Sequence, residues 1–270
     1  MTGQPENSEA ASSDLGELVA EFRGRLVVVA IPCLALGVAA GFIIGHGGAL
    51  GEVIAGLIVG VAVSVGLFLL CFLAWRKLTV RVYSGGLVYR TVKGDDLWRW
   101  SEVEEFLIRA EERENGVLLP QGLRYQVWYE LRQPGRKRTF DATIRGHARL
   151  SEMIEEFVTQ VQLPVALASF RSGSVVPFGK LLLGQDGLVV ASPKHPRFLP
   201  LTELAGISVS RYDVKVHRVG RKLAWLSVDR SDVPNAAVLA ELAMRIVVER
   251  DFQGGGESDA KLKPGQSPDA

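Results

Sequence analysis

The chain has 270 residues, 47% of them hydrophobic, and its 31 Lys and Arg almost balance its 30 Asp and Glu, which leaves a net charge of +1. A near-neutral chain has no long-range field to attract nucleic acid or an acidic substrate, so neither is expected as a partner. The two cysteines, Cys33 and Cys71, both lie in apolar runs. A disulfide framework and a zinc site built on cysteines are therefore excluded.

The N-terminal residues 1–14 are small, polar and acidic, so they cannot bury enough apolar surface to fold, and we predict a disordered tail. Residues 15–25 overlap an Asp14-x-x-Glu17 pattern that is typical of a helix start. Apolar residues repeat there at helical spacing, at Leu15, Leu18, Val19 and Phe22. This pattern predicts a short amphipathic helix lying on a membrane.

Two long apolar runs, 26–44 and 53–75, come next, and a short glycine-rich stretch, 45–52, joins them. At about 1.5 Å per residue, each run is long enough to cross a hydrocarbon core of roughly 30 Å as a helix. The sequence therefore predicts a two-helix transmembrane hairpin within 26–77. Arg and Lys flank its outer ends and are absent from the joining stretch, so the positive-inside rule predicts a multi-pass plasma-membrane protein with cytoplasmic N- and C-termini.

Small residues recur four positions apart in this region. They are Gly37, Gly41 and Gly45 in the first half, and Gly56, Gly60 and Ser64 in the second. Such spacing predicts transmembrane packing, because it lets two helix backbones approach closely. These small residues pack together either the two helices of one hairpin or helices of two chains, so the sequence does not decide whether the chain forms a homo-oligomer. Neither run carries a charged residue, which disfavours transport or channel activity.

After residue 77 the apolar period changes to two. Alternation over 78–83 ends at the turn 84–86, and alternation over 123–131 ends at the turn 133–135, which leads into a strand ending near Thr143. A helical period follows. Its apolar stripe consists of Leu150, Ile154, Phe157, Val158 and Val161, and we expect the helix to end before Pro164.

The same order recurs about 101 residues later in the sequence. Without a gap, 86–88 overlays 187–189, and 100–103 overlays 201–204. The second copy closes with a helix that carries Val238, Leu239, Leu242 and Ile246 on one side. We predict two copies of strands followed by one helix, each a small open barrel whose edge or end the helix covers. The copies take 78–163 and 164–250, and 251–270 is predicted to be disordered.

Short motifs in both copies carry a family resemblance. They are Gly86-Leu87-Val88 before Trp98-Arg99-Trp100-Ser101-Glu102-Val103, then Gly179-Lys180-Leu181, Asp186-Gly187-Leu188, Trp225-Leu226-Ser227-Val228 and Val233-Pro234-Asn235. They resemble the pleckstrin-homology (PH) superfold, and residues 15–250 look like an uncharacterised family of actinobacterial membrane proteins with an N-terminal transmembrane hairpin and PH-like cytoplasmic domains. The resemblance implies an α+β fold class with a membrane anchor, in which the hairpin precedes two tandem PH-like units.

The same resemblance bears on individual residues. It implies that Trp100 and Val103 are core residues and that Glu102 caps or pairs. Eukaryotic lipid-binding PH domains carry a basic cluster in the loop after their first strand, whereas 84–86 is a tight turn here. Phosphoinositide recognition of that kind is therefore not expected.

No catalytic or cofactor motif is present. The four histidines lie far apart in sequence without carboxylates or cysteines at ligand spacing, and no phosphate-binding loop, dinucleotide fingerprint or nucleophile elbow occurs. The acidic run over 102–114 is interrupted by Arg109 and Arg113, which indicates a solvated edge. We expect no enzyme activity, no cofactor and no metal.

Two basic groups are the candidate contact residues. Arg136, Lys137 and Arg138 follow one hairpin turn, and Arg218, Arg221 and Lys222 occupy the corresponding hairpin of the second copy. Each is either a contact for anionic headgroups or a partner, or an exposed edge that cations protect from aggregation.

The resulting hypothesis is a membrane-tethered, non-enzymatic PH-like interaction module that binds a protein partner or anionic lipid headgroups at the cytoplasmic face of the membrane. The alternative is a structural or assembly subunit that acts through transmembrane helix packing.

Overall fold

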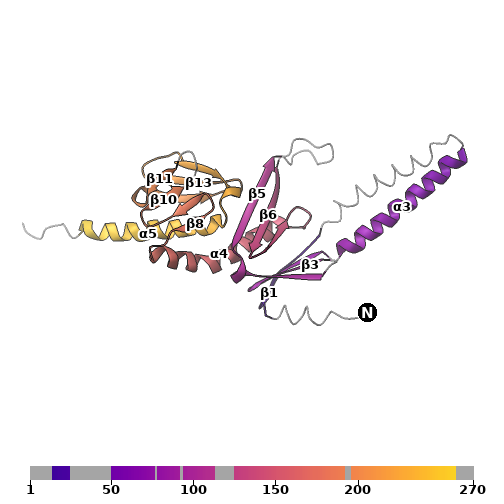
Figure 1. The fold of residues 1–270 in the computed structure, drawn as a ribbon, viewed down its shortest axis with the longest axis horizontal. Coiled ribbons are helices and arrows are strands. Elements are labelled where there is room, and N and C mark those ends of the chain that lie inside the picture. Colours follow the sequence, from indigo (N-terminus) through magenta and orange to yellow (C-terminus); the bar gives the residue numbers. More distant parts are fainter. Residues whose placement is uncertain are drawn as a thin grey trace, which may run out of the picture. The chain divides into compact units, whose positions relative to one another are not determined.

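The structure is a computed structural model that describes residues 14–24, 50–76, 78–91, 94–112, 125–191 and 196–259. Its strands form two four-stranded and two three-stranded sheets, and the strand pairs whose register is resolved are all antiparallel (Figure 1). The helices are α3 (Leu50–Arg76), α4 (His147–Arg171) and α5 (Ala236–Asp259). The described chain is thus mostly antiparallel sheet with few helices.

The sheets follow one another along the chain. The first, in the order β1-β2-β3-β4, contains β1 (Leu18–Arg23), β2 (Thr79–Tyr83), β3 (Gly86–Thr91) and β4 (Gly94–Arg99). After the 3-10 turn η1 (Trp100–Glu102) come β5 (Glu105–Glu112), β6 (Tyr125–Gln133) and β7 (Arg136–Phe140), in that order in their sheet.

The same series recurs after α4. The second four-stranded sheet, in the order β11-β10-β9-β8, contains β8 (Val176–Phe178), β9 (Leu181–Leu183), β10 (Gly187–Val190) and β11 (Arg197–Pro200). After the 3-10 turn η2 (Leu201–Glu203) come β12 (Leu204–Val209), β13 (Asp213–Arg218) and β14 (Leu226–Asp229), and a third 3-10 turn, η3 (Arg230–Asp232), leads toward α5.

Two glycines that overlay in the sequence hold the same place in this series. Gly86 begins β3 and Gly187 begins β10. A Cβ atom at Gly86 would clash with the Trp98 carbonyl, and one at Gly187 would clash with the Leu199 carbonyl. Both positions therefore need glycine so that the next strand can approach.

The chain divides into two compact units. The first consists of 1–103 and 138–154, and the second of 104–137 and 155–270.

In the first unit, residues 18–23 form a strand and not the predicted amphipathic helix. Strand β1 pairs with β2, with Phe22 opposite Val80, and Phe22 is buried. Leu15 is also buried, and its carbonyl accepts a hydrogen bond of 2.7 Å from the Gly85 N–H. The helix prediction was wrong because an isolated helix of this length is marginal, whereas the edge of β2 provides a row of hydrogen-bond partners.

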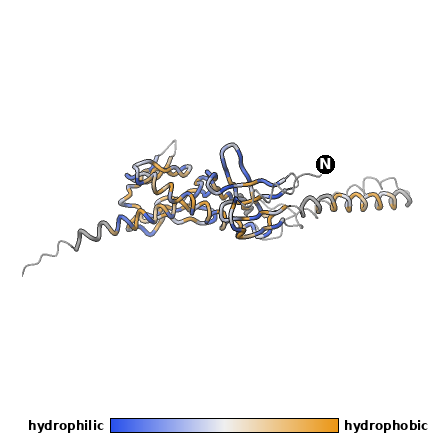
Figure 2. The backbone as a smooth tube through the Cα atoms, turned by 90° about the horizontal axis from the view of Figure 1, so that it is seen from below, coloured by the Kyte–Doolittle hydropathy of each residue, from blue (hydrophilic) through white to orange (hydrophobic). Residues whose placement is uncertain are grey.

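The apolar region between β1 and β2 requires a second correction. Helix α3 covers the second predicted span, and Figure 2 shows hydrophobic residues along its length. Ile58 and Val61 are among its exposed apolar side chains. The first predicted span, 26–44, lies outside the described residues. Within the ranges that the structure describes, no helix combines the length and the apolarity needed to cross a membrane.

The predicted transmembrane hairpin is overturned by this finding. The fold class with a membrane anchor, the integral two-span association with a membrane and the multi-pass plasma-membrane localisation are corrected with it. The prediction rested on the length of two apolar runs, and a hairpin requires two helices. Across the described residues of this region there is one helix, inserted between two neighbouring strands of a sheet.

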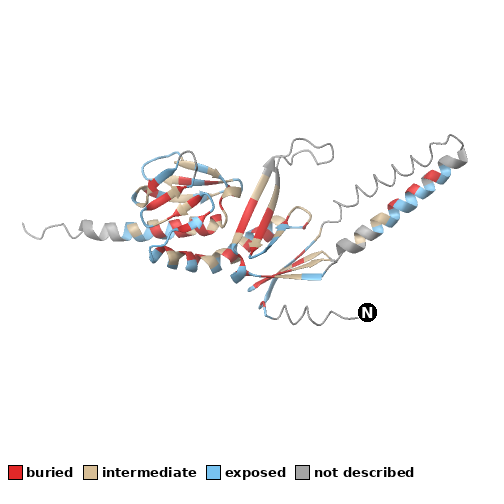
Figure 3. Cartoon of the chain, viewed as in Figure 1, coloured by how far each residue is buried: buried red, intermediate tan, exposed pale blue. Residues whose placement is uncertain are grey.

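In the second unit, α5 closes an apolar core. Its predicted stripe is buried throughout, which confirms that part of the helix prediction (Figure 3). The helix continues to Asp259, and residues 260–270 lie outside the described residues, so the disorder predicted for 251–270 stays a prediction.

Helix α4 also extends further than predicted, because it continues through Pro164 to Arg171. A proline inside a helix costs about 3 kcal/mol. Leu163, Ala166 and Phe170 are buried in the core of the second unit. The free energy gained by burying them offsets the cost of the proline. Local sequence rules do not include this gain, because it depends on contacts with distant residues.

Candidate functional site

A groove of about 630 Å³ lies between β12 and α5 in the second unit. The strand contributes Ile207 and Val209 to its lining, and the helix contributes mostly small or apolar side chains. Those helix residues are Ala237, Ala240, Met244, Val247 and Val248, with Glu241 among them. The groove has the size and the largely apolar lining that are typical of binding sites.

Helix α5 can line this groove because it carries a second apolar stripe. The first stripe, which includes Leu239 and Leu242, is fully buried in the core. The second follows at helical spacing through Ala237, Ala240, Met244 and Val248. Met244 is 51% exposed and Val248 is 47% exposed. An apolar stripe of this kind on a helix already packed in a core leaves surface for a further contact.

Strand β12 borders the groove with an open edge. Its sheet has the order β12-β13-β14, so the other edge of β12 pairs with no strand among the described residues. At the hairpin end the Ser210 N–H donates to the Asp213 carbonyl at 2.8 Å, which marks a hydrogen-bonded pair. Such pairs alternate along an antiparallel ladder. The N–H and C=O groups of Ile207 and Val209 therefore point away from β13, toward the open edge.

Two arginines hold the ends of the groove. Arg230 is buried, pairs with Glu155 and donates to the Ser210 carbonyl at 2.6 Å, just beyond the end of β12. Arg250 donates to the Leu201 carbonyl at 2.8 Å and to the Leu204 carbonyl at 3.0 Å, where β12 begins. These contacts place the start of α5 beside the end of β12, so the helix runs antiparallel to the strand.

The turn at the end of β12 carries a titratable group. Hydrogen bonds from the Ser210 hydroxyl and then from Lys215 lower the pKa of Asp213 below its ordinary value of 3.8. A lowered carboxyl pKa stabilises the fold above 3.8, and this stabilisation is lost as the pH falls through the folded-state pKa. The wild type should therefore have a higher free energy of unfolding than Asp213→Asn, by an amount that is constant above pH 3.8 and shrinks as the pH falls toward the folded-state pKa. Urea denaturation at several pH values would measure this difference. A pH-independent difference would contradict this.

The basic residues of the first predicted group, 136–138, do not all face solvent together. Arg136 and Lys137 are exposed at the start of β7, beside a hollow that Glu104, Glu105 and Arg132 also line. Arg132 pairs with Glu105 at 2.7 Å, and its hydrogen bond to Glu130 raises the pKa of Arg132. The hollow thus has mixed charge.

Arg138 has a structural position in the first unit. It pairs with Asp96 at 2.5 Å, and its guanidinium carbon lies 4.5 Å from the centre of the Tyr89 ring. Burial raises the pKa of Tyr89, against the opposite effect of the Arg138 charge. An arginine engaged on both sides is a poor candidate for a headgroup contact.

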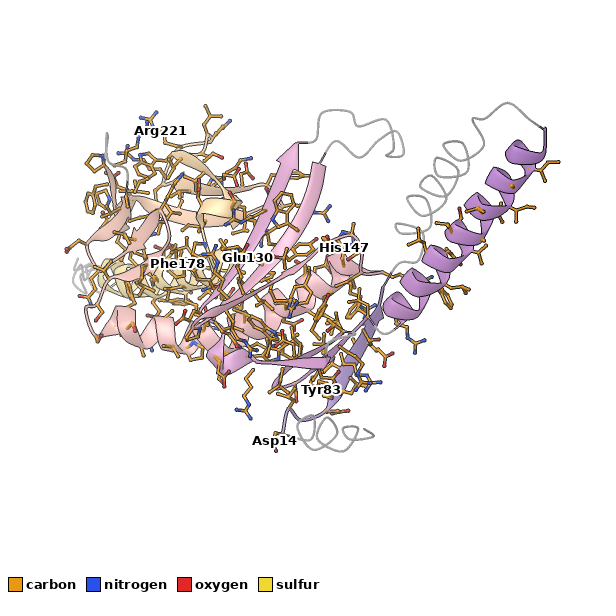
Figure 4. All side chains as sticks on the ribbon, turned by 45° about the vertical axis from the view of Figure 1, so that its right-hand side comes forward. Asp14, Tyr83, Glu130, His147, Phe178 and Arg221 are labelled. Atoms are coloured by element: carbon orange, nitrogen blue, oxygen red, sulfur yellow. The ribbon has the colours of Figure 1, made fainter. Side chains whose placement is uncertain are left out.

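The second basic group is divided in the same way. Arg218 pairs with Glu203 at 2.8 Å. Arg221 and Lys222 are exposed in the loop between β13 and β14, and Figure 4 shows Arg221 at the outside of that loop. Leu223, which follows them, is 83% exposed.

The predicted packing residues are only partly described. Gly37, Gly41 and Gly45 lie outside the described residues. Gly56, Gly60 and Ser64 are buried positions of α3, and the Ser64 hydroxyl donates to the Gly60 carbonyl at 2.9 Å. This bond is the local i to i−4 contact that serines make inside helices.

Metal-ligating side chains do not gather in the described ranges, where no three His, Cys, Asp or Glu residues could hold an ion. His46 and His195 lie outside those ranges. The Nε2 of His217 lies 2.8 Å from the Ser208 hydroxyl across the β12–β13 pair.

The sequence patterns did not predict the groove between β12 and α5. Its helical side had a signal, because Ala237, Ala240, Met244 and Val248 repeat at helical spacing next to the stripe that was recognised. Its strand side had no such signal, because the alternation within a single strand does not reveal which strands lie beside it in the sheet.

Comparison with known proteins gives a family. The model of a family of unknown function (DUF6585) matches residues 1–251. No curated protein matches the chain.

Proposed function

The chain belongs to the DUF6585 family, a family of unknown function, and we propose that it is a non-enzymatic interaction module that binds an extended segment of a protein partner. The binding surface is the groove between β12 and α5. The observation that carries the proposal is the open edge of β12 beside an apolar groove. An actinobacterial source stays a prediction, as does the absence of enzyme activity.

Strand addition explains how such a groove would bind. An extended segment that pairs with a sheet edge obtains affinity from main-chain hydrogen bonds and specificity from pockets for alternate side chains. The outward N–H and C=O groups of Ile207 and Val209 provide the former. The exposed stripe of α5, with Met244 and Val248, provides the latter.

Anionic lipid headgroups are less favoured as the ligand. Arg138 and Arg218 are held by Asp96 and Glu203 within their own units. Binding a headgroup through either arginine would break its existing ion pair to form a new one, so the net gain in binding free energy would be small.

A groove-filling variant tests the proposal. Random nine-residue peptides displayed on phage would be selected against the immobilised full chain, and the affinity of each selected peptide would be measured by fluorescence anisotropy. Ala240→Trp places an indole where the peptide would lie, and we expect it to weaken binding by about tenfold or more. Glu249→Trp adds the same side chain on an exposed position of α5 outside the groove and should leave the affinity unchanged.

Two outcomes would overturn the proposal. One is a selection that yields no peptide above background. The other is a set of peptides whose affinity is the same for the wild type and Ala240→Trp, provided that the variant keeps the circular dichroism spectrum of the wild type.

A further inference from the structure

We infer that the bound segment runs antiparallel to β12, places apolar side chains at alternate positions against α5, and carries a basic side chain close to Glu241. This inference rests on the proposed function and defines the chemistry of the partner. It follows from the register of β12, the directions of its side chains and the charges around the groove.

The register determines which strand residues the segment pairs with. Ile207 and Val209 direct their main-chain groups to the open edge, and Ser208 between them bonds toward β13. A segment that adds to this edge therefore forms its hydrogen-bonded pairs opposite Ile207 and Val209. Two residues of the segment, separated by one, occupy these positions.

Side-chain directions then decide which segment residues enter the groove. Ile207 and Val209 pack against the core of the second unit, on the side of α5. The Ser208 side chain is exposed on the opposite face, beside His217. Residues directly opposite each other across two strands share one face. The two paired residues of the segment consequently point at α5, and the residue between them points to the Ser208 face.

The helix surface explains why those two residues are apolar. Ala237 and Ala240 are small, so they leave depth beside the strand, and Met244 continues the apolar surface. A polar side chain placed there would lose its hydration without gaining a partner. Bulky apolar side chains fill the depth and cover Met244, which removes apolar area from water.

Charge selects a basic flank. The charged side chains that line the groove are Glu155, Arg230 and Glu241. Arg230 is already engaged by Glu155 and by the Ser210 carbonyl. Glu241 has a contact of 3.5 Å with Arg245, and its side chain is 35% exposed. The lining thus presents a carboxylate to an incoming segment, which attracts Lys or Arg and disfavours Asp or Glu.

The direction follows from the edge itself. Antiparallel pairing is slightly more stable per residue than parallel pairing, and every resolved pair of this sheet is antiparallel. An antiparallel segment begins near Val209 and ends near the start of β12. Since α5 is antiparallel to β12, the segment runs parallel to the helix.

Peptides selected on the full chain test the pattern. In a selected peptide that loses affinity with Ala240→Trp, we expect two positions separated by one whose change to Ser weakens binding by about tenfold, while the position between them tolerates Ser. Glu241→Lys should weaken peptides with a basic flank about threefold to tenfold, and Glu241→Gln should weaken them less.

A spin label tests the direction. Attached at the peptide N-terminus, it should broaden the amide signals of Arg211 and Tyr212, and attached at the C-terminus it should broaden that of Thr202. Three results would overturn this inference while leaving the groove as the binding site. They are the reverse pattern of broadening, an affinity that Glu241→Lys does not change, and two sensitive peptide positions that are adjacent. Insensitivity to Ala240→Trp would instead overturn the proposed function.

Discussion

Replacing Trp100 by alanine is expected to lower the free energy of unfolding by about 3–5 kcal/mol, the range for truncation of a large buried aromatic side chain. Trp100 is 1% exposed in the first unit, and its indole N–H donates to the Tyr83 carbonyl at 3.0 Å. The substitution removes the ring, opens a cavity and leaves a buried carbonyl without its donor. Urea denaturation followed by circular dichroism would measure the change.

Two control variants separate the contributions. Trp100→Phe retains most of the apolar volume and loses the donor, so it should cost less than Trp100→Ala. Leu223→Ala removes a side chain that is 83% exposed and should change stability by less than about 0.5 kcal/mol. If Trp100→Ala and Leu223→Ala had equal effects, the placement of Trp100 in the core would be refuted.

Replacing Asn235 by alanine is expected to cost about 2–3 kcal/mol, because two side-chain hydrogen bonds and a backbone preference are lost together. Its side-chain oxygen accepts from the Phe106 N–H at 2.7 Å, and its side-chain nitrogen donates to the Glu104 carbonyl at 2.7 Å. Its own N–H donates to the Phe106 carbonyl at 2.9 Å, and its φ is 52°. One residue thus joins the beginning of β5 to the beginning of α5 within the second unit.

Comparing Asn235→Gly with Asn235→Ala separates the side-chain hydrogen bonds from the backbone preference. Asn235→Gly loses the side-chain bonds and tolerates positive φ, so it should be less destabilising than Asn235→Ala by about 1 kcal/mol. Amide hydrogen exchange at Phe106 provides a local measurement and should become faster in both variants. Unchanged exchange at Phe106 would show that Asn235 does not hold β5.

Much of the strand and helix content followed from local patterns. The turn at 84–86, the hairpin turn at 133–135 and the buried stripe of α5 are as expected, because alternation and helical spacing report which side of an element is apolar. The ends of elements were less predictable. Helix α4 passes Pro164 because burial of Phe170 and its neighbours outweighs a local penalty.

The larger errors arose where an apolar pattern has more than one structural solution. The spacing of Leu15 and Phe22 suits a helix, yet 18–23 form a strand because β2 offers a partner. The apolar runs at 26–44 and 53–75 were assigned to a bilayer from their length, whereas the described chain has no helix that meets the requirements for crossing one. For the strand, the deciding partner is distant in sequence, because β2 lies beyond the whole apolar region.

By itself, the sequence determined which residues are apolar on which period, where the chain turns, and that one series of elements occurs twice. Tertiary structure alone decided that β1 completes the sheet of β2, that Arg138 and Arg218 are held by carboxylates, and that no described strand covers the edge of β12 beside α5. The physical reason is that periodicity depends on neighbours along the chain. Sheet edges, ion pairs and grooves depend on residues that meet only after folding, and their pairing energies are not encoded in any single segment.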